Sequence, residues 1–229
     1  MHNSPMPFYL KTGRETMSGK LQGTIQHIKK TYKKRTILRD ITFDIHEGEC
    51  IGILGGNGSG KSTLLSILAG VQKADEGTFT LSAVGYVPQE PPLIEELTGK
   101  DNLSLWYEKK EMEKELEDGV LAMLGIPAFL KTTVSKMSGG MKKRLAIGCA
   151  ACGNPTVLLL DEPSAALDLV CKERIANYLK DYKAHGGSII LATHDVQELE
   201  LCDRLFILKE GVLHPYEFDG NVHHLVGQL

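Results

Sequence analysis

The stretch Gly55-Gly-Asn-Gly-Ser-Gly-Lys-Ser-Thr63 determines how the rest of the chain is interpreted. It matches the P-loop pattern, in which a glycine-rich loop ends in Gly-Lys followed by Ser or Thr. The preceding residues Cys50–Leu54 form an apolar run of strand length, and the following residues Thr63–Ala69 favour a helix that Gly70 ends. The order of strand, glycine-rich loop and helix predicts a site that holds phosphate groups.

The residue types of this loop suit phosphate binding. Glycines adopt positive φ and carry no Cβ, so consecutive backbone N–H groups can converge on phosphate oxygens, and a helix beginning near Lys61 adds its positive dipole end. We expect Lys61 to contact the β- and γ-phosphates of a nucleoside triphosphate and the Ser62 hydroxyl to bind Mg²⁺. A glycine-rich turn without a ligand is the alternative, but five glycines between Gly52 and Gly60 precede Lys-Ser-Thr and argue against it. The predicted nucleotide-binding residues of the loop are Gly55, Gly56, Asn57, Gly58, Ser59, Gly60, Lys61, Ser62 and Thr63.

The composition is that of an ordinary globular protein with no electrostatic preference for nucleic acid. The 229 residues include 26 basic and 29 acidic ones, a formal net charge of −3, so we expect no nucleic-acid partner. No run approaches the roughly 18 apolar residues of a membrane-spanning helix, and the polar N-terminus shows no signal-peptide core. We expect residues 1–21 to form a flexible leader. Five cysteines, an odd number, fit a reducing cytoplasm.

Alternating apolar and polar residues predict strands on both sides of the loop. Residues Thr24–Ile28 alternate as an edge strand does, and Ile41–Ile45 alternate again. The runs Gly77–Leu81 and Val84–Val87 predict two further strands, which end at a proline-rich segment. The basic turn between the first two strands carries Tyr32, whose ring either packs against the protein or stacks on a base. The residues alone favour packing.

The segment from about residue 93 to 150 has a different character and predicts a helical insertion. Asn102–Tyr107 and Met112–Leu124 have helical spacing, and dense charge marks a solvated outer face. Ser138 has the residue type of an N-cap for a later helix. That helix carries the stretch Cys149–Cys152, whose two cysteines either bind a metal or lie on a buried face. No second cysteine pair stands at zinc spacing, so we expect the buried face.

Two apolar strands end in residues of catalytic type. The run Val157–Leu160 leads into Asp161 and Glu162, and burying two adjacent carboxylates costs free energy unless they have partners or a role. Asp161 is placed to hold hydrated Mg²⁺ and Glu162 to polarise an attacking water, and two solvated turn carboxylates are the alternative. The run Ser188–Thr193 delivers His194 to the edge where open α/β sheets bind ligands. A structural histidine remains an equal alternative there.

In order and spacing, these motifs resemble the nucleotide-binding domain of ATP-binding-cassette (ABC) transporters over about residues 22–217. The sequence Ser-Gly-Gly shortly before an Asp-Glu strand end is peculiar to that family. After the P-loop come Gln89 in Val-Pro-Gln, Met137-Ser-Gly-Gly-Met141, Leu158-Leu-Leu-Asp-Glu-Pro163, Ser164–Asp168 and Ala192–Asp195.

The resemblance implies roles for individual residues. Tyr32 is the aromatic residue that stacks on adenine, which reverses the packing interpretation, and His194 is the switch histidine. Asp168 belongs to the D-loop. The signature, which contacts the γ-phosphate held by the opposite subunit, consists of Ser138, Gly139 and Gly140. The implied catalytic residues are Glu162 (general base or water-positioning group), His194, Lys61 and Gln89. The implied metal-binding residues are Ser62, Gln89 and Asp161.

Departures from the family pattern leave every catalytic group in place. Gly56 stands where proline is usual, Met137 where leucine is usual, and Ala166 where glycine is frequent. Met141 in place of glutamine, followed by a basic run, resembles small exporter-type cassettes.

The resemblance also implies a fold and a function. The fold is α/β: a P-loop NTPase core with an N-terminal antiparallel β part and an inserted helical subdomain, followed by a tail at residues 218–229. The function is ATP hydrolysis with Mg²⁺ in a subunit that pairs head to tail with a second ABC ATPase subunit. Such a subunit drives transport through separately encoded integral-membrane permease subunits and lies at the cytoplasmic, inner face of the cell membrane. A soluble cassette that drives no transport, such as an iron–sulphur assembly ATPase, is the alternative. A subunit that only binds ATP is disfavoured because no catalytic residue is missing.

Overall fold

The structure, a computed structural model, describes residues 19–229. The predicted leader at residues 1–21 therefore lies outside the described residues, except for its last three, of which Leu21 already begins a strand. The strands join in one sheet in the order β4-β1-β2-β9-β8-β3-β7-β6-β5. Their bounds are β1 Leu21–Tyr32, β2 Arg35–His46, β3 Cys50–Leu54, β4 Glu76–Leu81, β5 Val84–Val87, β6 Val157–Asp161, β7 Ser188–Ala192, β8 Arg204–Lys209 and β9 Val212–Tyr216.

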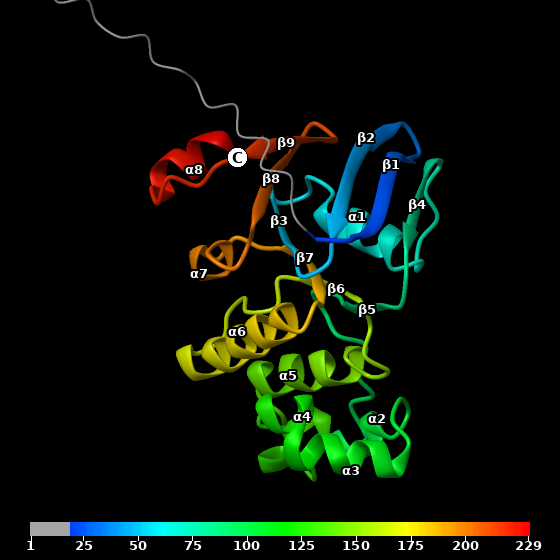
Figure 1. The fold of residues 1–229 in the computed structure, drawn as a ribbon, viewed down its shortest axis with the longest axis vertical. Helices are drawn as coiled ribbons and strands as arrows, with labels where there is room; N and C mark the ends of the chain where they lie inside the picture. Colours follow the sequence, from blue (N-terminus) through cyan, green and yellow to red (C-terminus); the bar gives the residue numbers. More distant parts are fainter. Residues whose placement is uncertain (1–18) are drawn as a thin grey trace, which may run out of the picture.

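The helices divide between the sheet and a separate helical part, which lies at the opposite end of the molecule from β1, β2 and β9 (Figure 1). The helical part contains α2 Gly99–Leu103, α3 Lys109–Asp118, α4 Val120–Met123, α5 Gly139–Ala150 and the short 3₁₀ helices at Ile126–Phe129 and Val134–Lys136. The remaining helices are α1 Lys61–Leu68, α6 Leu169–Ala184, α7 Val196–Leu199 and α8 Val222–Gln228. The α/β class predicted from the sequence is confirmed.

The central strands β3, β6 and β7 are buried along their whole length and pair in parallel. Both faces of the sheet are covered here, so these strands are continuous apolar runs rather than alternating ones. Along β6 the side chains divide between two cores: Leu158 and Leu160 face the helical part, whereas Leu159 faces α1 and the antiparallel strands. Each fully buried leucine contributes roughly 1.5–3 kcal/mol.

The N-terminal strands form the antiparallel part of the sheet. β1 pairs with β2 on one side and with β4 on the other, so β4 is the edge strand. The prediction that Thr24–Ile28 lies at an edge is therefore wrong. Its alternation has another cause, because the strand has one face in the core, where Ile25 and Ile28 are fully buried, and a second face that is more exposed.

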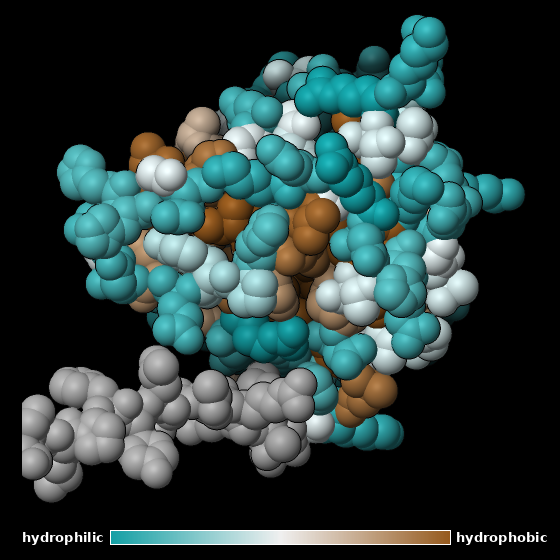
Figure 2. Space-filling model, turned by 90° about the horizontal axis from the view of Figure 1, so that it is seen from above, coloured by the Kyte–Doolittle hydropathy of each residue, from teal (hydrophilic) through white to brown (hydrophobic). Residues whose placement is uncertain are grey.

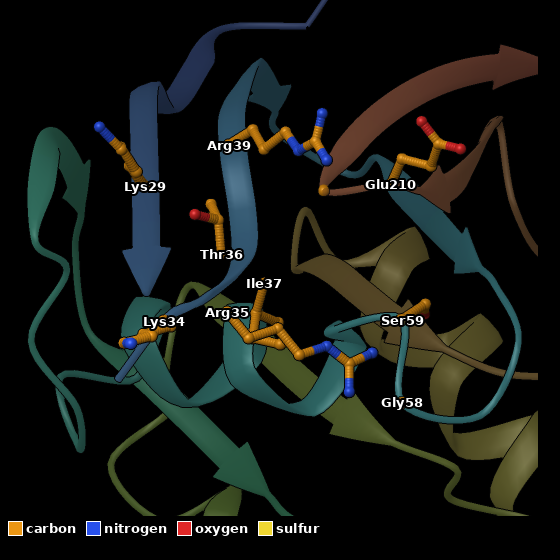
Figure 3. A pocket seen from close by; sticks show the side chains of 10 residues that line it. Lys29, Lys34, Arg35, Thr36, Ile37, Arg39, Gly58, Ser59 and Glu210 are labelled. Atoms are coloured by element: carbon orange, nitrogen blue, oxygen red, sulfur yellow. The ribbon is translucent and has the colours of Figure 1, made fainter. Parts of the chain in front are cut away.

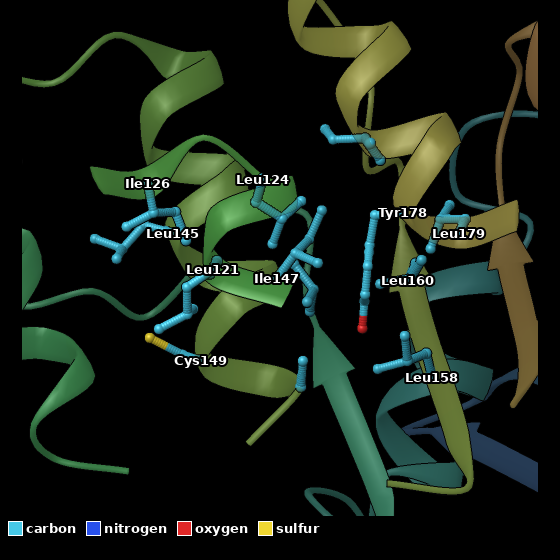
Figure 4. Packing of buried hydrophobic residues seen from close by; sticks show 14 of the residues in the cluster. Leu121, Leu124, Ile126, Leu145, Ile147, Cys149, Leu158, Leu160, Tyr178 and Leu179 are labelled. Carbon is cyan, nitrogen blue, oxygen red and sulfur yellow. The ribbon is translucent and has the colours of Figure 1, made fainter. Parts of the chain in front are cut away.

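Between β5 and β6 the described chain forms helices, as expected for the segment near residues 93–150. Ile147 of α5 lies on the side of Tyr178 of α6 and of Leu158 and Leu160 of β6, and all four belong to one buried cluster (Figure 4). The predicted helix Met112–Leu124 is interrupted at Gly119, where α3 ends and α4 begins. Here the Glu115 carboxylate accepts a hydrogen bond from the Val120 N–H at 2.8 Å and caps the second helix.

The C-terminal segment, predicted as a tail, contains helix α8. Its Leu225 is buried in a small core with Leu54 of β3 and Leu199 of α7. The surface at this end of the molecule is mainly hydrophilic, with a small group of hydrophobic side chains near its middle (Figure 2). Within residues 19–229, the length and apolar character that a bilayer-spanning helix needs are not found in any helix.

Candidate functional site

Four neighbouring parallel strands end at one edge of the sheet and carry the predicted site residues. β3 leads into the P-loop, β5 into Gln89, β6 into Asp161 and Glu162, and β7 into His194. The register aligns these ends, because Ala192 near the end of β7 pairs with Ile53 of β3 on one side and with Asp161 of β6 on the other. Ligands of open α/β sheets bind outside the carboxyl ends of the strands, so the topology itself assembles this site.

The P-loop has the features of a phosphate cradle. Gly60 precedes α1 in a left-handed conformation, and no side chain caps the helix, so its first N–H groups are free to bind an anion. Lys61 Nζ donates to Gly55 O at 2.6 Å and Gly56 O at 3.4 Å, and burial lowers the pKa of this lysine. The Ser59 hydroxyl is buried without a hydrogen-bond partner. An uncapped helix, a folded-back lysine and an unpaired hydroxyl fit a phosphate ligand.

The two carboxylates at the end of β6 have different surroundings. Asp161 is 2% exposed. Burial raises the pKa of Asp161, against the lowering effects of Ser62 and of the charges of Lys61 and Lys143. Glu162 is less buried and has a left-handed backbone, with φ of 48°. Such a conformation in a residue other than glycine is uncommon and is concentrated at functional sites.

Gln89 and His194 hold the two oxygens of Glu162. Gln89 Nε2 donates to Oε2 at 3.1 Å, and His194 Nε2 lies 3.2 Å from Oε1. Burial and, secondarily, the charge of Lys61 lower the pKa of His194 below its ordinary 6.5, against the opposing effect of Glu162. The lowered pKa favours the neutral ring, which can donate to Glu162 in the tautomer that carries its proton on Nε2.

A cavity of ≈ 510 Å³ joins Tyr32 to the P-loop and to Glu162. Its volume is within the range of small-molecule sites. The Tyr32 hydroxyl donates to Gln72 Oε1 at 2.7 Å, and the residue is 42% exposed. The cavity is lined by Tyr32, Arg35, Ile37, Asn57, Gly58, Ser59, Gly60, Lys61, Ser62, Thr63, Gln89 and Glu162.

A second, basic pocket of ≈ 740 Å³ adjoins the P-loop on its outer side. Lys29, Lys34, Arg35 and Arg39 line it, and the Arg35 side chain extends toward Gly58 and Ser59 of the P-loop (Figure 3). Arg35 lines both pockets, so its positive charge lies beside the phosphate cradle. From the sequence, Arg35 could be assigned only to a basic turn and not to a pocket beside the P-loop.

The signature residues lie apart from this cavity. Ser138 caps α5 as predicted, accepting a hydrogen bond from the Met141 N–H at 3.3 Å. Ser138 and Gly139 are exposed, Gly140 is buried against Cys171, and none of the three lines the P-loop cavity. Within one chain, the structure thus brings together every predicted catalytic and metal-binding residue but not the signature.

Two further predictions concern residues away from the phosphate cradle. Cys149 is buried in α5, Cys152 follows that helix, and both are free thiols. Across the described part of the chain, no three histidine, cysteine or acidic side chains are grouped as a metal site. The sequence interpretation missed Lys143, which is buried and contacts the Gln89 backbone. The spacing could have indicated this burial, because Lys143 stands four residues before Ile147 and therefore on the same, apolar face of α5.

Comparison with known proteins places this chain in a family. Residues 38–165 match the family described as ABC transporter. The linearmycin resistance ATP-binding protein LnrL of Bacillus subtilis is 34% identical over 204 residues, 81% of this chain. The chain spans just under two thirds (66%) of that relative's length. The lipopolysaccharide export system ATP-binding protein LptB of Acidithiobacillus ferridurans is 30% identical over 206 residues, covering 81% of this chain and 86% of the relative.

A solved structure has the same fold. It is a dimeric ATP-binding cassette in a post-hydrolysis state, bound to ADP and Pi, and is 28% identical to this chain. The match has a TM-score of 0.78 and covers 87% of this chain and 100% of the other. The sheet order, the strand-end site and these matches lead to one conclusion: this chain belongs to the ABC transporter family.

Proposed function

We propose that this protein is the ATP-binding and ATP-hydrolysing subunit of an ABC transporter. The observation that carries the proposal is the convergence of Gln89, Glu162 and His194 beside a P-loop whose helix end, lysine and serine are arranged for phosphate. The relatives are named as ATP-binding proteins of a resistance and an export system, which favours transport over a soluble non-transport cassette.

ATP binding follows from the cavity. The N–H groups of residues 55–63 and the Lys61 ammonium would hold the phosphates, and the Tyr32 ring at the other end would stack on adenine. The solved neighbour bound to ADP and Pi supports a nucleotide as the ligand. Oxygen donors of Ser62, Asp161 and Gln89 would hold Mg²⁺, which neutralises phosphate charge when bound.

Glu162 is the proposed general base. It would accept a proton from a water whose oxygen attacks the γ-phosphorus, while the bond from that phosphorus to the ADP oxygen breaks. Gln89 and His194 fix one carboxylate oxygen each, so the base is held in orientation before the water arrives. Lys61 stabilises the charge on the transferred phosphoryl group.

A second cassette completes the site in this proposal. The exposed helix N-terminus at Ser138 and Gly139 is free to bind the γ-phosphate held by a partner copy, because it does not reach the cavity of its own chain. The dimeric neighbour supports such pairing. Separately encoded membrane permease subunits would form the transport path, which places this subunit at the cytoplasmic face of the membrane.

Glu162→Gln tests the proposal. The amide keeps the shape of the carboxylate but does not accept the proton, so steady-state ATP hydrolysis should fall at least about a hundredfold while ATP binding persists. An ATP-bound dimer should accumulate on size-exclusion chromatography. Glu117→Gln, at an exposed position of α3, is the matched control and should hydrolyse ATP like the wild type. Hydrolysis by Glu162→Gln within a few fold of wild type would remove Glu162 from the mechanism.

A further inference from the structure

Three consecutive basic residues of α5 have three different environments. Lys142 is partly exposed and pairs with Glu95, with Nζ 2.8 Å from Oε1. Arg144 donates to a backbone carbonyl of the helical part at 2.8 Å. Lys143 is buried, with 7% of its surface exposed, and shares the buried face of the helix with Ile147. Of the three, Lys143 is the one that is buried.

The Lys143 ammonium holds the loop that follows β5. Its Nζ donates to Gln89 O at 3.0 Å and to Pro88 O at 3.4 Å. The side chain of the same glutamine donates from Nε2 to Glu162 Oε2 at 3.1 Å. Two hydrogen bonds to the loop backbone and one from a loop side chain therefore connect α5 to the proposed general base.

Packing alone does not account for a lysine at this position. Burial lowers the pKa of Lys143, and the charges of Asp161, Glu162 and Glu198 favour its protonated form. An unbranched apolar residue such as methionine would fill similar space without the free-energy cost of a buried charge. What the ammonium adds is a donor that reaches the two loop carbonyls.

We propose that Lys143 is a positioning residue, which fixes the Pro88 and Gln89 carbonyls to α5 and so places the Gln89 side chain against Glu162. The inference rests on the proposed function, because it takes Glu162 as the general base. The N-cap of α5 is Ser138, the residue expected to contact the ATP of a second subunit. The same contacts thus tie the position of the signature to the position of the group that activates water.

Amide hydrogen exchange of the nucleotide-free protein tests the contact itself. Lys143→Met should speed exchange in the peptide from Tyr86 to Glu90, which contains the end of β5 paired with Leu160, while peptides of β3 and β7 keep wild-type rates. Lys142→Met, the neighbouring variant that removes only a partly exposed ion pair, should leave the same peptide unchanged. Lys143→Gln, which keeps a shorter donor, replaces the methionine variant if the latter does not fold. The proposal would be overturned if the Lys143 variant exchanged at the wild-type rate in this peptide, or if it exchanged faster throughout the molecule.

Steady-state kinetics test the consequence for catalysis. A misplaced Gln89 should lower kcat roughly tenfold or more, because small displacements of catalytic groups are costly. The KM for ATP should change less than kcat, since the P-loop and Tyr32, which would hold the nucleotide, are not contacted by Lys143. Lys143→Arg keeps the charge and the donors and should recover most of the lost kcat. An arginine variant as slow as the methionine variant, or a methionine variant with wild-type kcat, would contradict a positioning role.

The two experiments separate this proposal from the proposed function. If the wild-type protein does not hydrolyse ATP, the proposed function fails, whereas the exchange measurement still reports on the contact between Lys143 and the loop. If hydrolysis and the effect of Glu162→Gln are as expected but Lys143→Met exchanges and turns over like the wild type, only the role of Lys143 is lost.

Discussion

Glu162 has one polar partner for each carboxylate oxygen. Gln89 Nε2 lies 3.1 Å from Oε2, and His194 Nε2 lies 3.2 Å from Oε1. The backbone adds a further constraint, because Glu162 has φ of 48° and its N–H donates to Ala192 O at 2.8 Å. Three strand ends therefore determine the orientation of one side chain, so changes to its neighbours should affect it in defined directions.

Tyr32 offers a test of nucleotide stacking. Tyr32→Ala should weaken ATP binding by about 1–3 kcal/mol if the ring stacks on adenine. Tyr32→Phe keeps the ring and loses only the hydrogen bond to Gln72, so it should bind ATP nearly as well as the wild type. Gln72→Ala is the matched control for that hydrogen bond. Titration calorimetry measures all three. Equal affinity in Tyr32→Ala and the wild type would return the ring to a packing role.

The pKa of His194 should respond to its two charged neighbours in opposite directions. Burial and Lys61 lower this pKa below 6.5, and Glu162 raises it. Lys61→Met should therefore raise the pKa of His194, and Glu162→Gln should lower it further. Nuclear magnetic resonance of the imidazole protons follows both, with His194→Gln to assign the signals. Shifts of the opposite sign would contradict the geometry of the site.

The same shift has a consequence for stability. Because the folded-state pKa of His194 lies below the unfolded value, the unfolded chain binds more protons in the interval between the two pKa values. His194 therefore makes the free energy of unfolding decrease as the pH falls below about 6.5.

At the residue scale, sequence patterns predicted which residues surround Glu162 but not every contact. The P-loop, Asp161, Glu162 and His194 follow strand-length apolar runs, so their placement at one sheet edge could be predicted. The burial of Lys143 was harder to predict, because a basic residue in a run of three is ordinarily solvated and only its spacing from Ile147 indicated the buried face. Its burial depends on how α5 packs against β5 and the loop that follows it, which only the folded chain determines.

At the scale of elements, the parallel strands were the most predictable part. A strand buried on both faces is an unbroken apolar run, as in Val157–Leu160, and is recognised without knowledge of its partners. Strand order was not predictable in the same way: β1 lies inside the sheet because β4 returns to pair with it. The break between α3 and α4 was not predicted either: it lies at Gly119, where the Glu115 carboxylate accepts a hydrogen bond from the Val120 N–H.

The P-loop leads into α1 through Gly60, which adopts a backbone conformation that favours glycine. Gly60 has φ of 112°, and a Cβ there would lie 2.8 Å from Ile37 Cγ2 and 3.0 Å from Leu38 Cδ2. Gly60→Ala should lower the free energy of unfolding by at least about 1–2 kcal/mol and weaken ATP binding, because the left-handed conformation alone costs that much. Urea denaturation and titration calorimetry measure the two effects.

Gly56→Ala is the matched control for Gly60→Ala. A Cβ at Gly56 would have its nearest neighbour, Leu229 O, at 3.9 Å, so the loop can accept it. Its free energy of unfolding should stay within roughly 0.5 kcal/mol of the wild type, as for an ordinary surface substitution. If the two alanine variants behaved alike, the special conformation at Gly60 would not matter.

At the scale of the whole molecule, the two proposed parts of the ATP site do not meet within one chain. The P-loop cavity lies at the sheet edge, and the signature lies at the exposed start of α5, outside that cavity. A twofold dimer in which the signature of one chain faces the P-loop cavity of the other would complete two sites, because a symmetric interface applies the same contact twice. The central claim is therefore that ATP is hydrolysed between two copies.

Complementation between two inactive variants tests that claim. Lys61→Ala damages the P-loop and Ser138→Arg damages the signature, so each homodimer should be inactive. In a mixed dimer, one site carries both lesions and the other combines an intact P-loop with an intact signature. Exchange of fluorescently labelled subunits must be shown first. A mixture of wild type with the doubly substituted chain must also show that one intact site turns over.

The most direct measurement is the ATPase rate of the mixed variants relative to each variant alone. The account predicts that mixing restores activity, up to the share that one intact site contributes. If the signature served its own chain, every site in the mixture would keep one lesion. No gain on mixing, with subunit exchange and single-site turnover established, would contradict hydrolysis between two copies.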